Sequence, residues 1–244
     1  MKGLSSQTVA LAKKELSSAL HSPATYGVWV FFLLFTSITF FYLQKFFSLD
    51  TASLRPYFSV IPLVYTLLIP AITMKSWAEE RKTGTAELLL TMPFSEWDLV
   101  LGKFLSSFII LMIALLLSLG IPLSLLPLGT FDLGVIFSEY MGALLLGMTA
   151  LALGLLFSSL AKNQISAFLG GVVVLLVIML LNQITSIMDL PKWIADLVNY
   201  LSLAFHFESF ARGILDSRDI LYFLLVTFLC LFINTRVLLF RKWR

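Results

Sequence analysis

Long runs of apolar residues without a single charge dominate this sequence and limit the folds that it can adopt. Residues 56–74 and 104–131, for example, contain no Asp, Glu, Lys or Arg. About 20 helical residues cross the hydrocarbon core of a bilayer, so runs of this length predict membrane-spanning helices. Composition agrees: 59% of the 244 residues are hydrophobic and only 13% are charged, about half the charged share of a soluble domain.

The pattern predicts an all-α integral membrane protein with six spans and one N-terminal amphipathic helix. The expected spans cover residues 24–47, 57–74, 99–121, 133–160, 164–187 and 220–240. In residues 1–22, apolar side chains recur at helical spacing with lysines on another side, which is typical of a helix lying in the membrane interface. A short soluble leader is the alternative for this segment. Residues 23–244 are expected to form one six-span domain.

One long charged segment, residues 75–103, interrupts the apolar runs and holds nine of the thirty-one acidic and basic residues. Because charge-free runs flank it, we expect it to lie in water between two spans. Gly84 permits a left-handed backbone, and Thr85 is suited to cap a new helix. Pro93 stops that helix because proline lacks an amide hydrogen. The segment therefore predicts a short helix over Thr85–Met92.

The stretch Glu80–Ser95, ERKTGTAELLLTMPFS, resembles the first cytoplasmic loop of ABC-2 type permeases, the membrane subunits of one class of ABC exporter, also called type V. In that family the short helix between the glycine and the proline is the coupling helix, which docks on an ATPase subunit. The resemblance implies a cytoplasmic coupling loop over residues 75–98. An ordinary charged loop is the alternative, because loops rich in Gly and Pro are common.

The resemblance also implies a role for each matching position. The residues expected to couple to the ATPase are Glu80, Arg81, Gly84, Thr85, Glu87, Leu88, Leu89, Leu90 and Pro93. Among them, Gly84 is expected to form the turn and residues 88–90 to supply apolar anchors. Glu87 and Arg81 are expected to orient the contact by charge.

A later stretch, Phe205–Asp219, resembles the gliding-motility-associated branch of the same family. Residues 188–219, which contain it, are expected to form helices at the outer membrane interface, because their apolar residues share helical faces. The candidate residues of this outer motif are His206, Glu208, Arg212, Gly213, Asp216 and Asp219. We expect His206 to be a structural residue of this interface, with ligand binding as the alternative.

Three polar residues fall inside the expected spans and are candidates for a pathway or for packing. Glu139 is expected to reach the lipid headgroups, with a cavity as the alternative. Asn182 and Gln183 point to different helix faces, so at least one should bond another helix; lining a substrate path is the alternative. The glycines of the fourth span are expected to permit close helix packing: Gly142, Gly147 and Gly154.

The distribution of positive charge predicts the orientation of the chain. If both termini face the cytoplasm, twelve of the seventeen Lys and Arg residues lie on the inner side and five on the outer side. This bias obeys the positive-inside rule. It predicts a multi-pass protein of the bacterial cytoplasmic (inner) membrane, with residues 75–98 in the cytoplasm.

The residues that are scarce exclude several classes of function. One cysteine and two distant histidines predict neither a disulfide framework nor a metal site, and the sequence contains no phosphate-binding loop. The net charge of +3 is too small to indicate nucleic-acid binding. We therefore expect no catalytic residues and no directly bound cofactor, with ATP and Mg²⁺ held by a partner ATPase.

Together these features predict the permease subunit of an ATP-driven ABC exporter. Its expected partners are an ABC ATPase dimer, a second permease copy or a related permease, an auxiliary membrane or periplasmic subunit, and the lipid bilayer. The alternative is a transport-inactive scaffold or assembly subunit that uses an ABC ATPase, for example in motility or envelope assembly. The apolar spans are compatible with a lipid, a polymer or a peptide as substrate.

Overall fold

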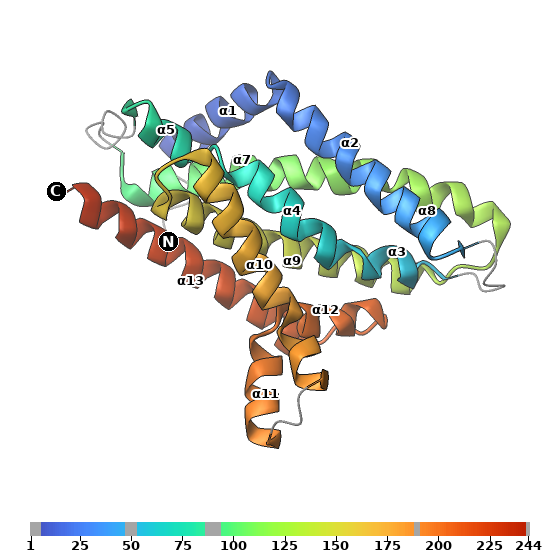
Figure 1. The fold of residues 1–244 in the computed structure, drawn as a ribbon. Helices are drawn as coiled ribbons and strands as arrows, with labels where there is room; N and C mark the ends of the chain where they lie inside the picture. The colour runs from blue at the N-terminus through green and yellow to red at the C-terminus, as the bar shows by residue number, and fades with distance from the viewer. Residues whose placement is uncertain (1–5, 47–52, 86–93, 188–190, 243–244) are drawn as a thin grey trace.

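The computed structural model describes residues 6–46, 53–85, 94–187 and 191–242. These residues form helices joined by short turns, and no strand occurs among them (Figure 1). Within this described part, six helical stretches are long and apolar enough to cross a membrane. The prediction of an all-α membrane fold with six spans is therefore confirmed.

The helices follow one another with few interruptions. In the first half of the chain they are α1 (Ser6–Leu20), α2 (Pro23–Ile38), the π-helix η1 (Thr39–Leu43), α3 (Arg55–Ser59), α4 (Ile61–Thr73) and α5 (Ala78–Lys82). In the second half they are α7 (Glu96–Ser118), α8 (Gly120–Leu125), the 3₁₀-helix η3 (Leu126–Leu128), α9 (Leu133–Leu160), α10 (Gln164–Ile187), α11 (Lys192–Leu201), α12 (Leu203–Ala211) and α13 (Ser217–Lys242).

Two differences between the predicted and the observed spans occur at prolines. The second span is split, because Pro62 lies in the first turn of α4 and α3 ends just before it. The third span was expected to end at residue 121, ahead of Pro122. Helix α7 ends at Ser118, but Pro122 lies in the first turn of α8, where its missing amide hydrogen breaks no helical bond, and the apolar helical stretch continues to Leu128.

Helix α9 lies at the centre of the bundle, and 72% of its most apolar stretch is buried. Two of its glycines allow this position. A Cβ atom on Gly154 would lie 2.5 Å from Oγ1 of Thr73 in α4, and one on Gly147 would overlap Leu111 of α7. The interpretation of these glycines as sites of close packing is confirmed.

Helix α13 packs on another side of α9 and contacts it through buried hydroxyl groups. Thr149 of α9 donates to the backbone carbonyl of Phe223 at 3.0 Å, and its Oγ1 lies 2.9 Å from that of Thr227. All three side chains are buried. Two other spans are far less buried. In the first span, which begins with α2, 17% of the apolar stretch is buried, and in α10 the buried share of the apolar stretch is 22%.

Different helices lie at the two ends of the bundle. Helix α5, the turn between α9 and α10, and the C-terminal end of α13 gather at one end, and α3 and α8 lie at the other (Figure 1). Helix α12 packs on α9 through Phe207 and Phe210, whereas α11 projects from the bundle with Trp193 72% exposed.

The amphipathic N-terminal helix is present as α1 and packs along α7. Its buried residues are Thr8, Leu11 and Ala12, and Leu11 fills the space above Gly102 of α7. Lys13 and Lys14 are exposed. Its packing fixes α1 beside the start of α7; its place in the membrane interface stays a prediction.

Candidate functional site

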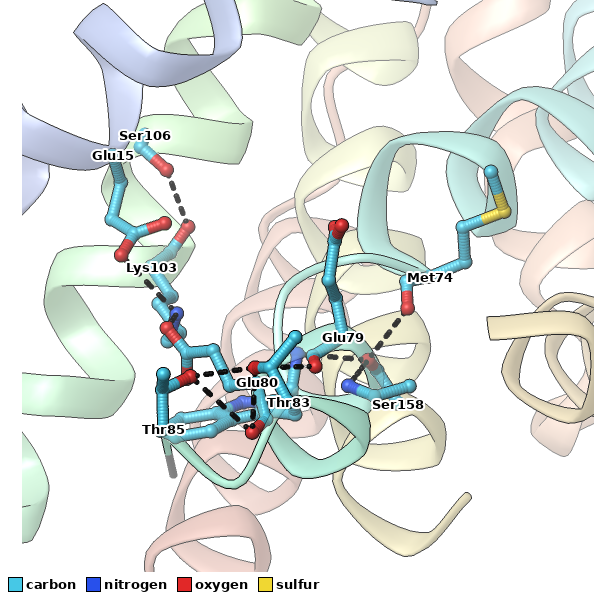
Figure 2. Close-up of polar contacts among 11 residues, drawn as sticks. Glu15, Met74, Glu79, Glu80, Thr83, Thr85, Lys103, Ser106 and Ser158 are labelled. Carbon is cyan, nitrogen blue, oxygen red and sulfur yellow. Dashed lines mark hydrogen bonds and ion pairs between the residues drawn. The ribbon is translucent and has the colours of Figure 1, made fainter. Parts of the chain in front are cut away.

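A buried lysine joins three helices at the end of the bundle that carries α5. Lys103 of α7 is 1% exposed, and its Nζ donates to Glu80 Oε1 of α5 at 2.7 Å and to Glu15 Oε1 of α1 at 3.3 Å (Figure 2). The ammonium also lies 4.9 Å from the centre of the Trp77 ring. Buried charges persist when they are paired, so the ammonium holds both carboxylates against α7. We name these four residues the Lys103 cluster.

The start of α5 is held by a hydroxyl group from the central helix. Ser158 of α9 accepts hydrogen bonds from the backbone amides of Trp77 and Ala78 at 3.2 and 3.4 Å. It also lies 3.4 Å from the carbonyl of Met74, to which it can donate. The first amides of a helix have no partner within the helix, so Ser158 acts as a cap supplied by a neighbouring helix.

Arg81 fastens the other side of α5 to the C-terminal end of α9. Its Nη1 donates to the carbonyls of Ser159 and Leu160, each at 3.3 Å, and to that of Ala161. Carbonyls at a helix C-terminus lack partners in the helix and carry partial negative charge, which a guanidinium stabilises. Helix α5 is therefore fixed to both α7 and α9 by charged side chains.

The chain leaves α5 through a glycine turn, as the sequence predicts. Gly84 adopts a φ of +74°, in the left-handed region that glycine favours. Thr83 donates to the carbonyl of Glu79 at 3.0 Å, and Thr85 to that of Glu80 at 3.3 Å. In the described part of the chain, the Thr85 hydroxyl thus bonds a carbonyl of the helix that precedes it, α5. Capping of the following helix by Thr85 stays a prediction.

The chain returns at α7, whose start is equally well fixed. Ser95 accepts from the Asp98 amide at 3.1 Å and forms a full capping box with the Asp98 side chain. Thr8 of α1 donates to the same carboxylate at 2.6 Å. Ser95 therefore caps α7, and the capping carboxylate of Asp98 is also bound to α1.

Between these two fixed ends lies the expected coupling helix. Residues 86–93 fall outside the described residues, so most of the predicted helix Thr85–Met92 is not placed. The expected roles of five residues there stay predictions: Glu87, Leu88, Leu89, Leu90 and Pro93.

Glu80 and Arg81 lie differently from what their expected role suggests. We expected both to couple to the ATPase, and that role stays a prediction. In the structure the Glu80 side chain is 17% exposed and paired with Lys103, and Arg81 binds carbonyls of α9. Both side chains therefore position α5 within the chain, next to the segment that was expected to dock.

The structure does not place Glu139 at the headgroups, as we had expected. Glu139 is 0% exposed in α9, and among the described residues neither carboxyl oxygen has a hydrogen-bond partner. The expectation is wrong because Glu139 lies on the inward face of α9 and not on its lipid-facing side.

Asn182 and Gln183 line a cavity of about 610 Å³ between α2, α4, α10 and α12. The walls are largely apolar, with Phe35, Leu63 and Phe207 among them. Oδ1 of Asn182 is buried, and it has no hydrogen-bond partner in the described part of the chain. The two amides thus meet at one cavity, which corresponds to the alternative of a path-lining position.

The outer motif gathers around a buried histidine at the opposite end from the Lys103 cluster. His206 is 2% exposed; its Nδ1 lies 2.6 Å from Asp219 Oδ1, and its Nε2 lies 3.0 Å from the Tyr200 carbonyl. Its ring stacks on Tyr222 with centroids 3.8 Å apart. These contacts join α11, α12 and α13, which agrees with a structural role.

The remaining residues of the outer motif shape the turn after α12. Gly213 has a φ of +80°, and Asp216 accepts from the Arg218 amide at 2.9 Å at the start of α13. Glu208 and Arg212 form an exposed i,i+4 ion pair, a kind that contributes little stability.

The family model described as ABC-2 family transporter protein matches residues 9–233 of this chain. The chain belongs to the ABC-2 family. The resemblance drawn from Glu80–Ser95 is thereby confirmed. Membership in the ABC-2 family also agrees with six spans and with a charged segment between the second and third of them.

Two curated relatives carry permease names. "Probable multidrug ABC transporter permease YbhR" of Escherichia coli K12 is 27% identical over 159 residues, which are 64% of this chain and 42% of that protein. "Probable ABC transporter permease protein NosY" of Pseudomonas aeruginosa PAO1 is 32% identical over 169 residues, 64% of this chain and 61% of that protein. The match thus spans less than two thirds of either relative. Neither name refers to gliding motility, so that finer assignment stays a prediction.

Sequence reasoning missed the residues that organise this end of the ABC-2 chain. Lys103, Glu15 and Ser158 were not candidates, although Lys103 stands at the edge of a long apolar run. A lysine there signals a buried ion pair, because an isolated charge in an apolar setting is costly. Ser158 gave no signal, because its role depends on where α5 lies.

Proposed function

We propose that this ABC-2 protein is the membrane-spanning permease subunit of an ATP-driven exporter, and that residues 85–94 transmit ATPase movement to its helices. The proposal is supported mainly by the observation that the helices on both sides of this segment are bound to other helices by side-chain contacts. Helix α5 is bound to α7 and α9 through Lys103 and Arg81, and the start of α7 is bound to α1 through Asp98. A force on residues 85–94 therefore reaches three helices through short, charged contacts.

In this mechanism the partner ATPase binds ATP and Mg²⁺, and the permease responds to its shape. ATP binding closes an ATPase pair, and the docked segment moves with it. A ligand shifts a conformational equilibrium only through different contacts in the two states. Here the differing contacts are those between residues 85–94 and the open or closed ATPase pair.

A second permease copy or a related permease completes the membrane part. The first span and α10 are the least buried spans, at 17% and 22%, so they offer the most apolar surface for a partner helix. The cavity lined by Asn182 lies between these two spans. We propose that the substrate crosses beside this cavity, at the junction of the two copies.

The substrate that suits this cavity is a mostly apolar molecule with a few polar groups. Its walls are largely apolar, and Asn182, Gln183 and Glu208 are among the polar residues that line it. This fits the word "multidrug" in the name of the E. coli relative. Ligand sites combine apolar walls with a few polar groups in the same way.

We further propose that both termini and α5 face the cytoplasm of a bacterium, in its inner membrane. The bias of Lys and Arg supports this orientation. Helix α5, the α9–α10 turn and the end of α13 share one end of the bundle, as the orientation requires (Figure 1).

The proposal is tested by retention of a candidate ABC ATPase on the detergent-solubilised, tagged chain, followed by ATP turnover. Gly84→Pro is expected to lose the ATPase, because proline cannot adopt a φ of +74°. Leu89→Asp is expected to lose it at least tenfold, because a charge replaces an apolar anchor.

The matched controls are Gly84→Asn, since asparagine tolerates the left-handed region, and Leu89→Met, which keeps an apolar side chain. Both should retain the ATPase, and all four variants should elute as folded protein. Binding and turnover by Gly84→Pro and Leu89→Asp at wild-type levels would refute a docking role for this segment.

A further inference from the structure

Glu139 is a buried carboxyl group for which the proposed transport mechanism has no use. It lies six residues into α9, about 9 Å along the helix axis from Leu133. Each of its carboxyl oxygens exposes less than 1 Å² and has no hydrogen-bond partner among the described residues. A buried polar group in this state calls for a specific explanation.

The polar groups nearest in the chain are committed elsewhere. Ser138 donates to the carbonyl of Phe210 at 3.1 Å, and the Tyr140 hydroxyl lies 3.1 Å from Ser118 Oγ. Asp132 caps α9 by accepting from the amides of Gly134 and Val135. None of them satisfies Glu139.

A cavity of about 220 Å³ lies beside Glu139, toward the end of the bundle that carries α3. Arg55 of α3 and Asp132 line it together with Glu139. Arg55 is exposed, and within the described part of the chain it forms no ion pair with either carboxylate. A cavity of this size and polarity can hold water.

An ionised carboxylate cannot stay in such a place without compensation, because burying an unpaired charge costs many kcal/mol and the group becomes neutral instead. A metal ion, an ammonium group or a water would have to touch the carboxyl oxygens. Each of those oxygens exposes less than 1 Å², which leaves no room for a metal ion or an ammonium group against it. A proton is the one cation small enough to neutralise them where they stand.

We propose that Glu139 is a proton-binding site of this permease, occupied and closed in this conformation. It exchanges its proton with water in the adjacent cavity when a shift of α3 or α9 brings the carboxyl group to that cavity. The proton then passes to water, and the carboxylate left behind pairs with the Arg55 guanidinium. The site is independent of residues 85–94, at the other end of the bundle, so it stands or falls separately from ATPase docking.

The test is infrared spectroscopy of the full-length protein in lipid nanodiscs at neutral pH. A protonated carboxyl group has a C=O stretching band that an ionised carboxylate lacks. The band is expected in wild type, absent in Glu139→Gln and retained in Asp132→Asn, which removes the other carboxyl group of the cavity. Wild type labelled with ¹³C-glutamate should shift the band, which assigns it to glutamate without any substitution.

A wild-type minus Glu139→Gln difference that contains only carboxylate bands would overturn the proposal. The exchange route has its own test in D₂O, where the band shifts as deuterium replaces the proton. Ile136→Ala, which enlarges the cavity, should speed this shift several-fold, and Phe137→Ala, which lies outside the cavity lining, should not. Equal rates in the two variants would exclude the cavity as the route.

Discussion

At the scale of single residues, Lys103 shows how one buried charge can organise a region. Lys103→Met would leave Glu80 and Glu15 facing an apolar side chain with no cation. Removing one partner of a buried ion pair costs about 3–5 kcal/mol, and we expect a loss near the lower limit because both carboxylates keep some exposure. The free energy of unfolding, measured by denaturant titration in mild detergent, checks this.

Three further variants serve as controls for Lys103→Met. Adding Glu80→Gln to Lys103→Met should recover part of the loss, because the stranded carboxylate is then removed. Adding Glu79→Gln, an exposed neighbour, should recover nothing. Lys75→Met, at an exposed lysine of the same segment, should change stability by less than about 0.5 kcal/mol. If Lys75→Met and Lys103→Met cost the same, the Lys103 cluster is not a stabilising contact.

The same residues show why part of the site was invisible in the sequence. Gly84 was identified because its role depends on local backbone geometry, which neighbouring residues determine. The partners of Lys103 lie 88 and 23 positions away along the chain. Glu139 was placed wrongly for a related reason: distance from a span end sets its depth, but only packing decides which side of α9 faces inward.

At the scale of helices, α5 is five residues long and cannot be stable alone. Ser158→Ala removes the cap on its first amides and should destabilise it by about 1 kcal/mol, which corresponds to roughly fivefold faster local opening. Hydrogen–deuterium exchange of the amides of Trp77 and Ala78, followed by mass spectrometry, measures this directly.

Ser159→Ala is the matched control, because among the described residues the Ser159 hydroxyl bonds only the Leu156 carbonyl of its own helix. Its effect on exchange in α5 should be negligible. Equal exchange in α5 for wild type and Ser158→Ala would show that Arg81 and Lys103 hold the helix without the cap.

Helix bounds were predictable where the signal was a change of composition. The expected fourth and fifth spans, 133–160 and 164–187, coincide with α9 and α10. The predicted helix bounds differ from the observed ones where the backbone changes geometry inside an apolar run. The π-helix η1 at the end of the first span and the continuation past Pro122 leave the hydrophobic pattern unaltered, so the pattern cannot reveal them.

At the scale of the whole molecule, the orientation in the membrane has a direct test. In a Cys230→Ser background, a cysteine at exposed Lys162 should react with a membrane-impermeant maleimide only after permeabilisation of the cells. A cysteine at exposed Lys192 of α11 should react in intact cells, because α11 projects from the bundle away from α5. The reverse labelling pattern would invert the proposed topology and remove residues 85–94 from the cytoplasm.

The contact between α9 and α13 also has a consequence for synthesis of the chain. The ribosome completes α9 at Leu160 but makes its partner α13 only after residues 161–216 have emerged. Until then, Thr149 lacks its contacts with Phe223 and Thr227, and one side of the central helix stays open to lipid. Translation that stalls before residue 217 therefore leaves the buried hydroxyl of Thr149 without these partners, so the packing of the central helix is complete only after α13 has been made.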